Sequence, residues 1–274
     1  AVKLGKMDGL GVCLSQSGRS EVIGRSVLPG AELPVLVELP YGYHDGGIDK
    51  YLEVAAKALA MPNSYRIDGK VVLTRYPKVR EGDLDTAEAF RNALDEKFGK
   101  DKFIVIYYVG AFEKGLPHTH MTPEALVEAR EYLRKVLRKT DGIFMAGWEV
   151  YWPRRYGAKF EREVVTPLLQ SVLSEPEFAG KKYLGMPICF GHENNYRWAY
   201  SIDSTGTDLG TERLETMTTL RPDFVLCCEW DEENENTHVR PTVSNGYTHQ
   251  RILRHFADKW AGRTFDVFPG DDTS

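Results

Sequence analysis

Residues 229–235 form a run of carboxylates, in the order Glu-Trp-Asp-Glu-Glu-Asn-Glu. Cleavage of a glycosidic bond needs two positioned carboxyl groups, because one donates a proton to the leaving oxygen and the other acts as base or nucleophile. Glu229 ends a predicted buried strand, where partial desolvation raises the pKa of a carboxyl group. Glu232 and Glu235 follow it at three and six residues. Two of these acids are therefore candidates for acid/base catalysis, and a solvated acidic loop is the alternative interpretation.

Side chains suited to sugars follow most of the other predicted strands. Aromatic rings offer flat apolar faces to a pyranose, while carboxylates, amides and guanidinium groups bind its hydroxyls. Each ring alone could instead pack under a loop, but four of the five tryptophans come just after predicted strands. The candidate substrate-binding residues are Tyr41, His44, Arg75, Tyr76, Tyr108, Trp148, Glu149, Tyr151, His192, Asn194, Asn195, Trp198 and Trp230.

The elements that must position these residues alternate between short apolar runs and longer amphipathic segments. This alternation predicts βα units around a parallel sheet. Seven strands are predicted, over residues 9–14, 34–39, 71–76, 103–109, 142–148, 183–190 and 224–229. Runs that are apolar on both faces, such as 103–108, must be covered on both sides.

Helices are predicted over residues 48–61, 85–98, 122–137, 160–173 and 247–256. Thr122 and Pro123 make an N-cap followed by a proline at the first helical position. Asp85 is the predicted cap of the second helix and Gly99 its stop. Asp8-Gly9 and Asp141-Gly142 are matching entries into strands.

We predict an α/β fold, a (β/α)8 TIM-type barrel formed as a single catalytic domain over residues 1–274. Seven strands do not close an eight-stranded barrel, so a first βα unit is expected to be missing from the chain. In such barrels the active site lies at the carboxyl ends of the strands, where the candidate residues are placed.

Composition excludes several classes of function. The formal net charge is −5 with a pI near 5.9, so no broad basic surface is available for nucleic acid. No apolar run approaches the roughly 20 residues that span a bilayer. The four cysteines have no CxxC spacing and are interpreted as small buried side chains, so no metal or other cofactor is expected.

The carboxylate segment resembles the NEWxEGTxIEP signature of glycoside hydrolase families 71 and 99 and their WbsX-like relatives. Glu229-Trp230 matches the Glu-Trp of that signature, and residues 237–241 match Thr-x-Ile-Glu-Pro with Arg240 in place of Glu. Residues 62–72 are similar to the hPxYyrxxGKPvv stretch of these barrels. Residues 7–11 resemble their GxDGF entry into a strand, so the resemblance spans most of the chain.

The resemblance implies a glycoside hydrolase that acts on an oligo- or polysaccharide and is exported to the periplasm or the cell exterior. In family 99 the first Glu of the motif deprotonates the 2-hydroxyl of the sugar and the second is the general acid/base. Glu229 would take the first role. Three extra residues separate Glu229-Trp230 from Thr237, so the second Glu maps to Glu232 or to Glu235.

Two other functions compete with hydrolysis by carboxylates. A glycan-binding or polysaccharide-assembly barrel would keep the aromatic residues without turnover. His118 and His120 form an HxH pair that could bind a metal ion in a metal-dependent hydrolase, although no carboxylate ligand stands at an obvious spacing. The sugar, the anomeric configuration and the oligomeric state are not predicted.

Overall fold

The main sheet consists of strands that neighbour one another in the order in which they follow along the chain. The computed structural model describes residues 8–13, 32–39, 47–76, 79, 81–109, 122–145, 159, 161–194, 200–202, 206–227 and 237–264. The sheet order is β1 (Leu10–Cys13), β2 (Val35–Leu39), β4 (Lys70–Arg75), β5 (Phe103–Val109), β6 (Gly142–Met145), β7 (Tyr183–Ile188) and β10 (Phe224–Cys227). Each pair from β1 to β7 is parallel, and the short β3 (Arg66–Ile67) is antiparallel to β4.

This strand order identifies the architecture. A doubly wound sheet reverses its order at a switch point, whereas a barrel adds each new strand beside the previous one. The first and last strands also approach each other, since a Cβ on Gly11 of β1 would lie 2.9 Å from Leu226 of β10. The fold is therefore a TIM-type α/β barrel, and the seven predicted strands are confirmed.

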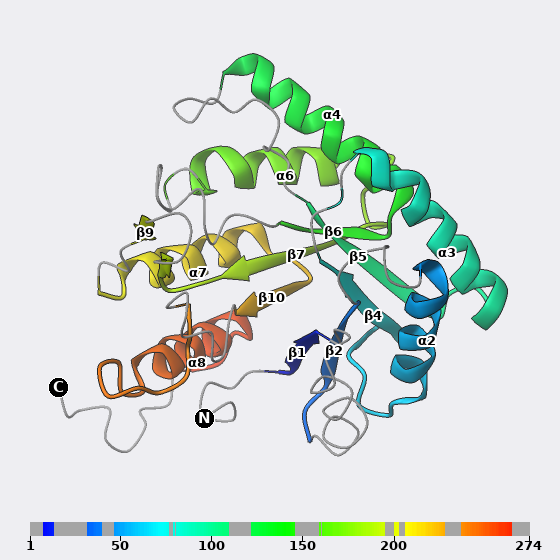
Figure 1. Cartoon of the computed structure of the whole chain (residues 1–274). Coiled ribbons are helices and arrows are strands. Elements are labelled where there is room, and N and C mark those ends of the chain that lie inside the picture. The colour runs from blue at the N-terminus through cyan, green and yellow to red at the C-terminus, as the bar shows by residue number, and fades with distance from the viewer. Residues whose placement is uncertain are drawn as a thin grey trace. The chain divides into compact units, whose positions relative to one another are not determined.

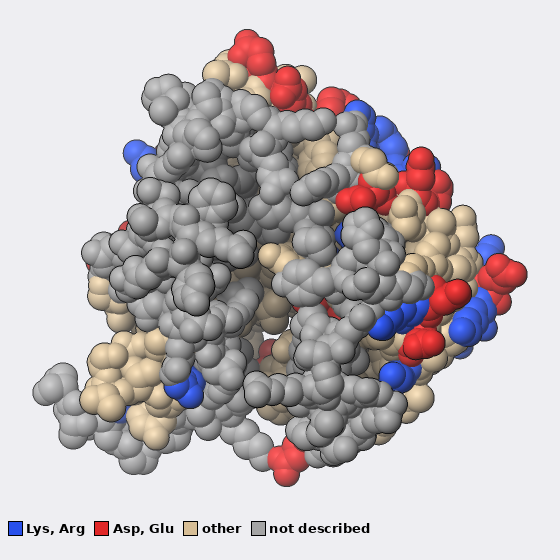
Figure 2. All heavy atoms as spheres, in the orientation of Figure 1, with Lys and Arg blue, Asp and Glu red and all other residues tan. Residues whose placement is uncertain are grey.

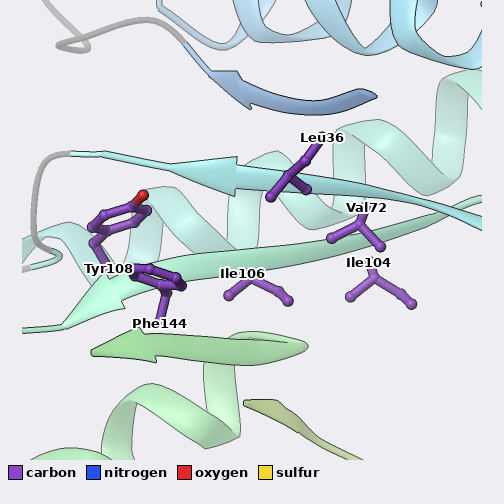
Figure 3. Close-up of a cluster of buried hydrophobic side chains, with 6 residues drawn as sticks. All are labelled: Leu36, Val72, Ile104, Ile106, Tyr108 and Phe144. Atoms are coloured by element: carbon purple, nitrogen blue, oxygen red, sulfur yellow. The ribbon is translucent and has the colours of Figure 1, made fainter. Parts of the chain in front are cut away.

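Apolar side chains fill the space enclosed by the sheet. Figure 3 shows a cluster that alternate residues of β2, β4, β5 and β6 contribute, pointing toward one another. Its buried members are Leu36, Val72, Ile104, Ile106, Tyr108 and Phe144. Gly185 of β7 leaves room for this core, because a Cβ there would lie 2.5 Å from Phe144 and 2.4 Å from Phe224. The interior is thus a packed core, as in other barrels of this type.

Helices cover the outer face of these strands (Figure 1). They are α2 (Gly47–Ala60), α3 (Leu84–Phe98), α4 (Pro123–Lys139) and α6 (Thr166–Leu173). α2 packs on β2 and β4, and α4 packs on β6. The predicted Thr122 cap is confirmed, since its hydroxyl accepts a hydrogen bond from the N–H of Ala125 at 3.2 Å. The prediction that Asp85 caps α3 is wrong, because a 3₁₀ turn over Glu81–Asp83 precedes the helix.

Aspartates at the amino ends of the strands bind the neighbouring strand. Oδ2 of Asp141, just before β6, accepts the N–H of Val105 in β5 at 2.8 Å. Oδ2 of Asp223, just before β10, accepts the N–H of Leu184 in β7 at 2.7 Å. Both contacts join an aspartate to a backbone group of the preceding strand, so they help to set the register of the sheet.

Among the described residues, 188–221 and 227–264 belong to a second compact unit. It holds the hairpin of β8 (His192–Asn194) and β9 (Tyr200–Ile202), and the helices α7 (Asp208–Leu220) and α8 (Thr248–Trp260). Close packing here depends on Gly210, where a Cβ would lie 2.2 Å from the ring of Phe190. Helix α7 was not predicted from the sequence.

Candidate active site

The predicted catalytic carboxylates Glu229, Glu232 and Glu235 lie outside the described residues. The same holds for most of the predicted substrate-binding residues and for the two histidines of the alternative metal site. These are Tyr41, His44, Trp148, Glu149, Tyr151, Asn195, Trp198, Trp230, His118 and His120. Their roles remain predictions, and the described part of the site comes from strands β2, β4, β5 and β6.

Two predicted substrate-binding residues, Tyr76 and Tyr108, are brought together at the carboxyl end of this core. Their rings meet edge to face with centroids 5.2 Å apart. The ring of Tyr108 also packs on Phe144 of β6, with centroids 4.4 Å apart. Tyr108 is buried and Tyr76 only partly buried. The aromatic cluster therefore runs from the core toward the end of the strands.

A carboxylate that sequence reasoning missed belongs to the same region. Glu38 of β2 comes two residues after Leu36, a member of the interior cluster, so alternation places both on the interior face. Glu38 pairs in register with Thr74 of β4, which is buried. The sequence signal for this residue was a carboxylate inside an otherwise apolar strand, because burying a charged group without a hydrogen-bond partner costs free energy.

Arg75 is not brought together with these residues. It follows Thr74 in β4 and therefore lies on the opposite face of the strand, toward the helices. Its guanidinium lies over the ring of Tyr107, 5.8 Å from the centroid, and both side chains are buried. This position suits packing between sheet and helices.

The loop after β4 is attached to the neighbouring elements. The N–H of Val79 donates to the carbonyl of Tyr108 at 2.7 Å. The hydroxyl of Tyr132, on α4, donates to the carbonyl of Val79 at 2.5 Å. These two bonds hold the segment beside Tyr76 against β5, so they help to position the aromatic pair.

The predicted residues His192 and Asn194 lie in β8. β8 and β9 pair antiparallel, with His192 opposite Ile202 and Asn194 opposite Tyr200. The connection after β7 therefore begins with a regular hairpin.

A buried cation lies beside the predicted apolar cysteines. Nη1 of Arg213, on α7, lies 3.3 Å from Sγ of Cys189, and both side chains are fully buried. Burial raises the pKa of the Cys227 thiol to about 12, Cys189 adds to the rise and Arg213 opposes it. The Cys227 thiol is thus protonated at neutral pH, and Cys189 accepts a hydrogen bond from Arg213.

Two histidines follow the carboxylate segment. His249 of α8 stacks on Phe190, with centroids 4.3 Å apart and planes 19° from parallel. The pKa of His249 is lowered by burial and by the nearby His238, while a hydrogen bond to the backbone of His238 opposes the shift. The neutral imidazole is therefore the favoured form in the folded chain.

Among the residues that the structure describes, no three His, Cys, Asp or Glu side chains gather in a way that could hold a metal ion. No helix among the same residues combines the length and apolar character needed to cross a bilayer.

Two solved structures have a fold similar to that of this chain. The chain shares its fold with a family 99 endo-α-mannosidase from Bacteroides thetaiotaomicron. One structure of that enzyme, in complex with bis-tris propane, has a TM-score of 0.66 and 11% sequence identity, covering 95% of this chain and 81% of its own. A second structure has a TM-score of 0.63 and 12% identity, covering 95% and 77%. No family model matches the sequence. No curated protein matches it either.

Proposed function

We propose that this protein is a glycoside hydrolase that cleaves a glycosidic bond by carboxylate acid/base catalysis at the carboxyl face of the barrel. The observation that carries the proposal is the edge-to-face pair of Tyr76 and Tyr108 at the end of the barrel core, with Glu38 in register with Thr74 on the neighbouring strand β2, on a fold shared with a family 99 enzyme. A carboxylate beside aromatic rings is a suitable surface for a sugar.

The catalytic roles follow from the family motif. Glu229 is the base that removes the proton of the 2-hydroxyl, and Glu232 or Glu235 is the acid that protonates the leaving oxygen. Both steps need a carboxyl group held within hydrogen-bond reach of its proton. Tyr76 supplies a ring beside the sugar, and Glu38 accepts hydrogen bonds from its hydroxyls. The substrate is an oligo- or polysaccharide, and α-linked mannosides are the first ones to test.

The test is hydrolysis of a panel of glycans by the wild-type chain and by Glu229→Gln, Glu232→Gln and Glu235→Gln. Loss of Glu229 and of one of the other two acids should lower kcat by about a hundredfold or more, the usual contribution of a positioned acid or base. Glu53→Gln on α2, an exposed glutamate, is the matched control.

Two outcomes count against the proposal. Unchanged turnover in all three variants would remove these acids from the mechanism. Glycan binding without hydrolysis in the wild type would favour a glycan-binding barrel.

A further inference from the structure

The connection between β10 and α8 contains a second feature after the carboxylates, a tight turn over residues 241–247. Thr242 and Gly246 form an antiparallel bridge, and the N–H of Gly246 donates to the carbonyl of Thr242 at 2.9 Å. Oγ1 of Thr242 accepts the N–H of Asn245 at 3.0 Å and lies 3.0 Å from Oγ of Ser244. The turn is thus a rigid, internally bonded loop.

The turn is also fixed to α8. The N–H of Thr248 donates to the carbonyl of Asn245 at 3.1 Å, and the N–H of Arg251 donates to the carbonyl of Tyr247 at 3.0 Å. Val239 lies just before the turn, and its carbonyl accepts a hydrogen bond from the side chain of Gln250 on α8. Both residues are buried. Little conformational freedom is left to lose if this surface binds a ligand.

This rigid turn exposes apolar side chains. Three large apolar side chains count as exposed in the described part of the chain, and the turn holds two of them, Val243 (fully exposed) and Tyr247 (52% exposed). The third, Val127, lies on α4. Ser244 and Thr248 are exposed beside them, and Gly246 has open space where a Cβ would stand. An aromatic ring, an apolar side chain and hydroxyl groups therefore share one accessible surface.

The turn itself carries no charged side chain, whereas Arg240 precedes it and the exposed Arg251 follows it on α8. Residues 241–250 contain no Asp, Glu, Lys or Arg. In Figure 2 the lower left region, where Figure 1 places α8, is mostly tan, with a Lys or Arg side chain at its edge. The turn offers no cation of its own to a phosphate, sulfate or uronate, so Arg240 and Arg251 are the cations nearest to it in sequence. The hydroxyls and C–H faces of a neutral sugar would find matching partners on the turn.

We propose that the turn over residues 241–247 is a sugar-binding subsite, in which Tyr247 stacks on a neutral pyranose unit of the chain that is being cleaved, away from the scissile bond. The inference rests on the proposed function, since the turn and Glu229, Glu232 and Glu235 belong to the same connection. It deepens that function by assigning a neutral, extended glycan as the substrate class.

The experiment compares Tyr247→Ala and Tyr247→Phe with the wild type, using neutral α-mannan oligosaccharides of increasing length. Binding is measured by calorimetry and hydrolysis by product release. Tyr247→Ala should weaken binding of long oligosaccharides by about three- to tenfold, the range of one aromatic contact, and leave the shortest cleavable substrate unaffected. Tyr247→Phe should bind like the wild type. Val127→Ser on α4 is the control for loss of an exposed apolar side chain, and thermal unfolding verifies that each variant is folded.

Several results would overturn the subsite. These are an unchanged affinity in Tyr247→Ala, equal losses for short and long substrates, or tighter binding of an anionic glycan than of a neutral one. A wild-type dimer that Tyr247→Ala dissociates in sedimentation would make the surface an interface between two copies. Length-dependent binding that requires Tyr247, without hydrolysis, would support the subsite and refute the hydrolase. Failure to bind any glycan would refute both.

Discussion

The ring of Tyr108 packs on Phe144 and also meets Tyr76 edge to face, with the Tyr76 centroid 5.2 Å away at an interplanar angle of 87°. This contact joins the packed core of the barrel to the end of its strands. Stability and substrate binding should therefore respond to different parts of the same side chain.

Tyr108→Ala should lower the free energy of unfolding by about 3–5 kcal/mol, because it opens a cavity between two aromatic rings. Tyr108→Phe keeps both ring contacts and should cost about 1 kcal/mol. Urea unfolding followed by tryptophan fluorescence measures the difference. Similar losses in the two variants would mean that the hydroxyl group, and not the ring, supports the fold.

Glu38→Gln should lower kcat/KM on a cleaved glycan by about ten- to hundredfold, since a hydrogen bond to a charged group contributes roughly 1.5–3 kcal/mol. The side chain keeps its shape, so the melting temperature should stay close to that of the wild type. The exposed Glu53→Gln controls for the change in charge. Wild-type kinetics in Glu38→Gln would remove this residue from the site.

Gly142→Ala should destabilise the fold by about 2–4 kcal/mol, the cost of overpacking against rigid atoms. The added Cβ would stand 2.4 Å from the carbonyl oxygen of Tyr183, and neither backbone can move without breaking the sheet. Gly82→Ala is the control because a Cβ there meets nothing within 4 Å. A chemical denaturation curve for each variant shows whether close approach of the strands is the cause.

His249 should make the stability fall on the acid side of neutrality. Its pKa in the folded chain is lowered from an ordinary value of 6.5, chiefly by burial. As the pH falls below 6.5, the unfolded chain binds a proton that the folded chain does not, so stability is lost until the folded pKa is reached. Above pH 6.5 His249 is mostly neutral in both the folded and the unfolded chain, so it does not lower the stability there.

The measurement is the free energy of unfolding at a series of pH values between about 5 and 8, the span in which histidines titrate. His249→Phe keeps a ring against Phe190 and should flatten the acid limb. His255→Phe on the exposed side of the same helix should not. An acid limb that persists in His249→Phe would assign it to another group.

Much of the scaffold could be predicted because its strands are short, continuous apolar runs, two of which begin at an Asp-Gly pair. Gly142 begins β6 as expected, and the run at Phe103–Val109 is buried on both faces. Helix α7 was missed since its sequence contains Gly210 and several threonines, which have low helix propensity. Its stability comes from contacts such as that of Arg213 with Cys189, which no local pattern contains.

The candidate site was predicted less completely, for a different reason. Tyr76 and Tyr108 were named from their position at strand ends, and the structure brings them together. Arg75 was named on the same basis, but the alternation of side chains turns it toward the helices. Glu38 was overlooked because position at the end of a strand, rather than the face of the strand, guided the choice.

The aspartates before β6 and β10 accept hydrogen bonds from main-chain N–H groups of the preceding strands, and Asp141 also pairs with Arg91. These contacts help to align the strands at their amino ends, and because they use main-chain N–H groups they persist through most substitutions elsewhere. The opposite rim is left free to acquire new loops and new specificities. A chain built in this way can keep a common scaffold with a mannosidase while agreeing with it at only 11% of positions.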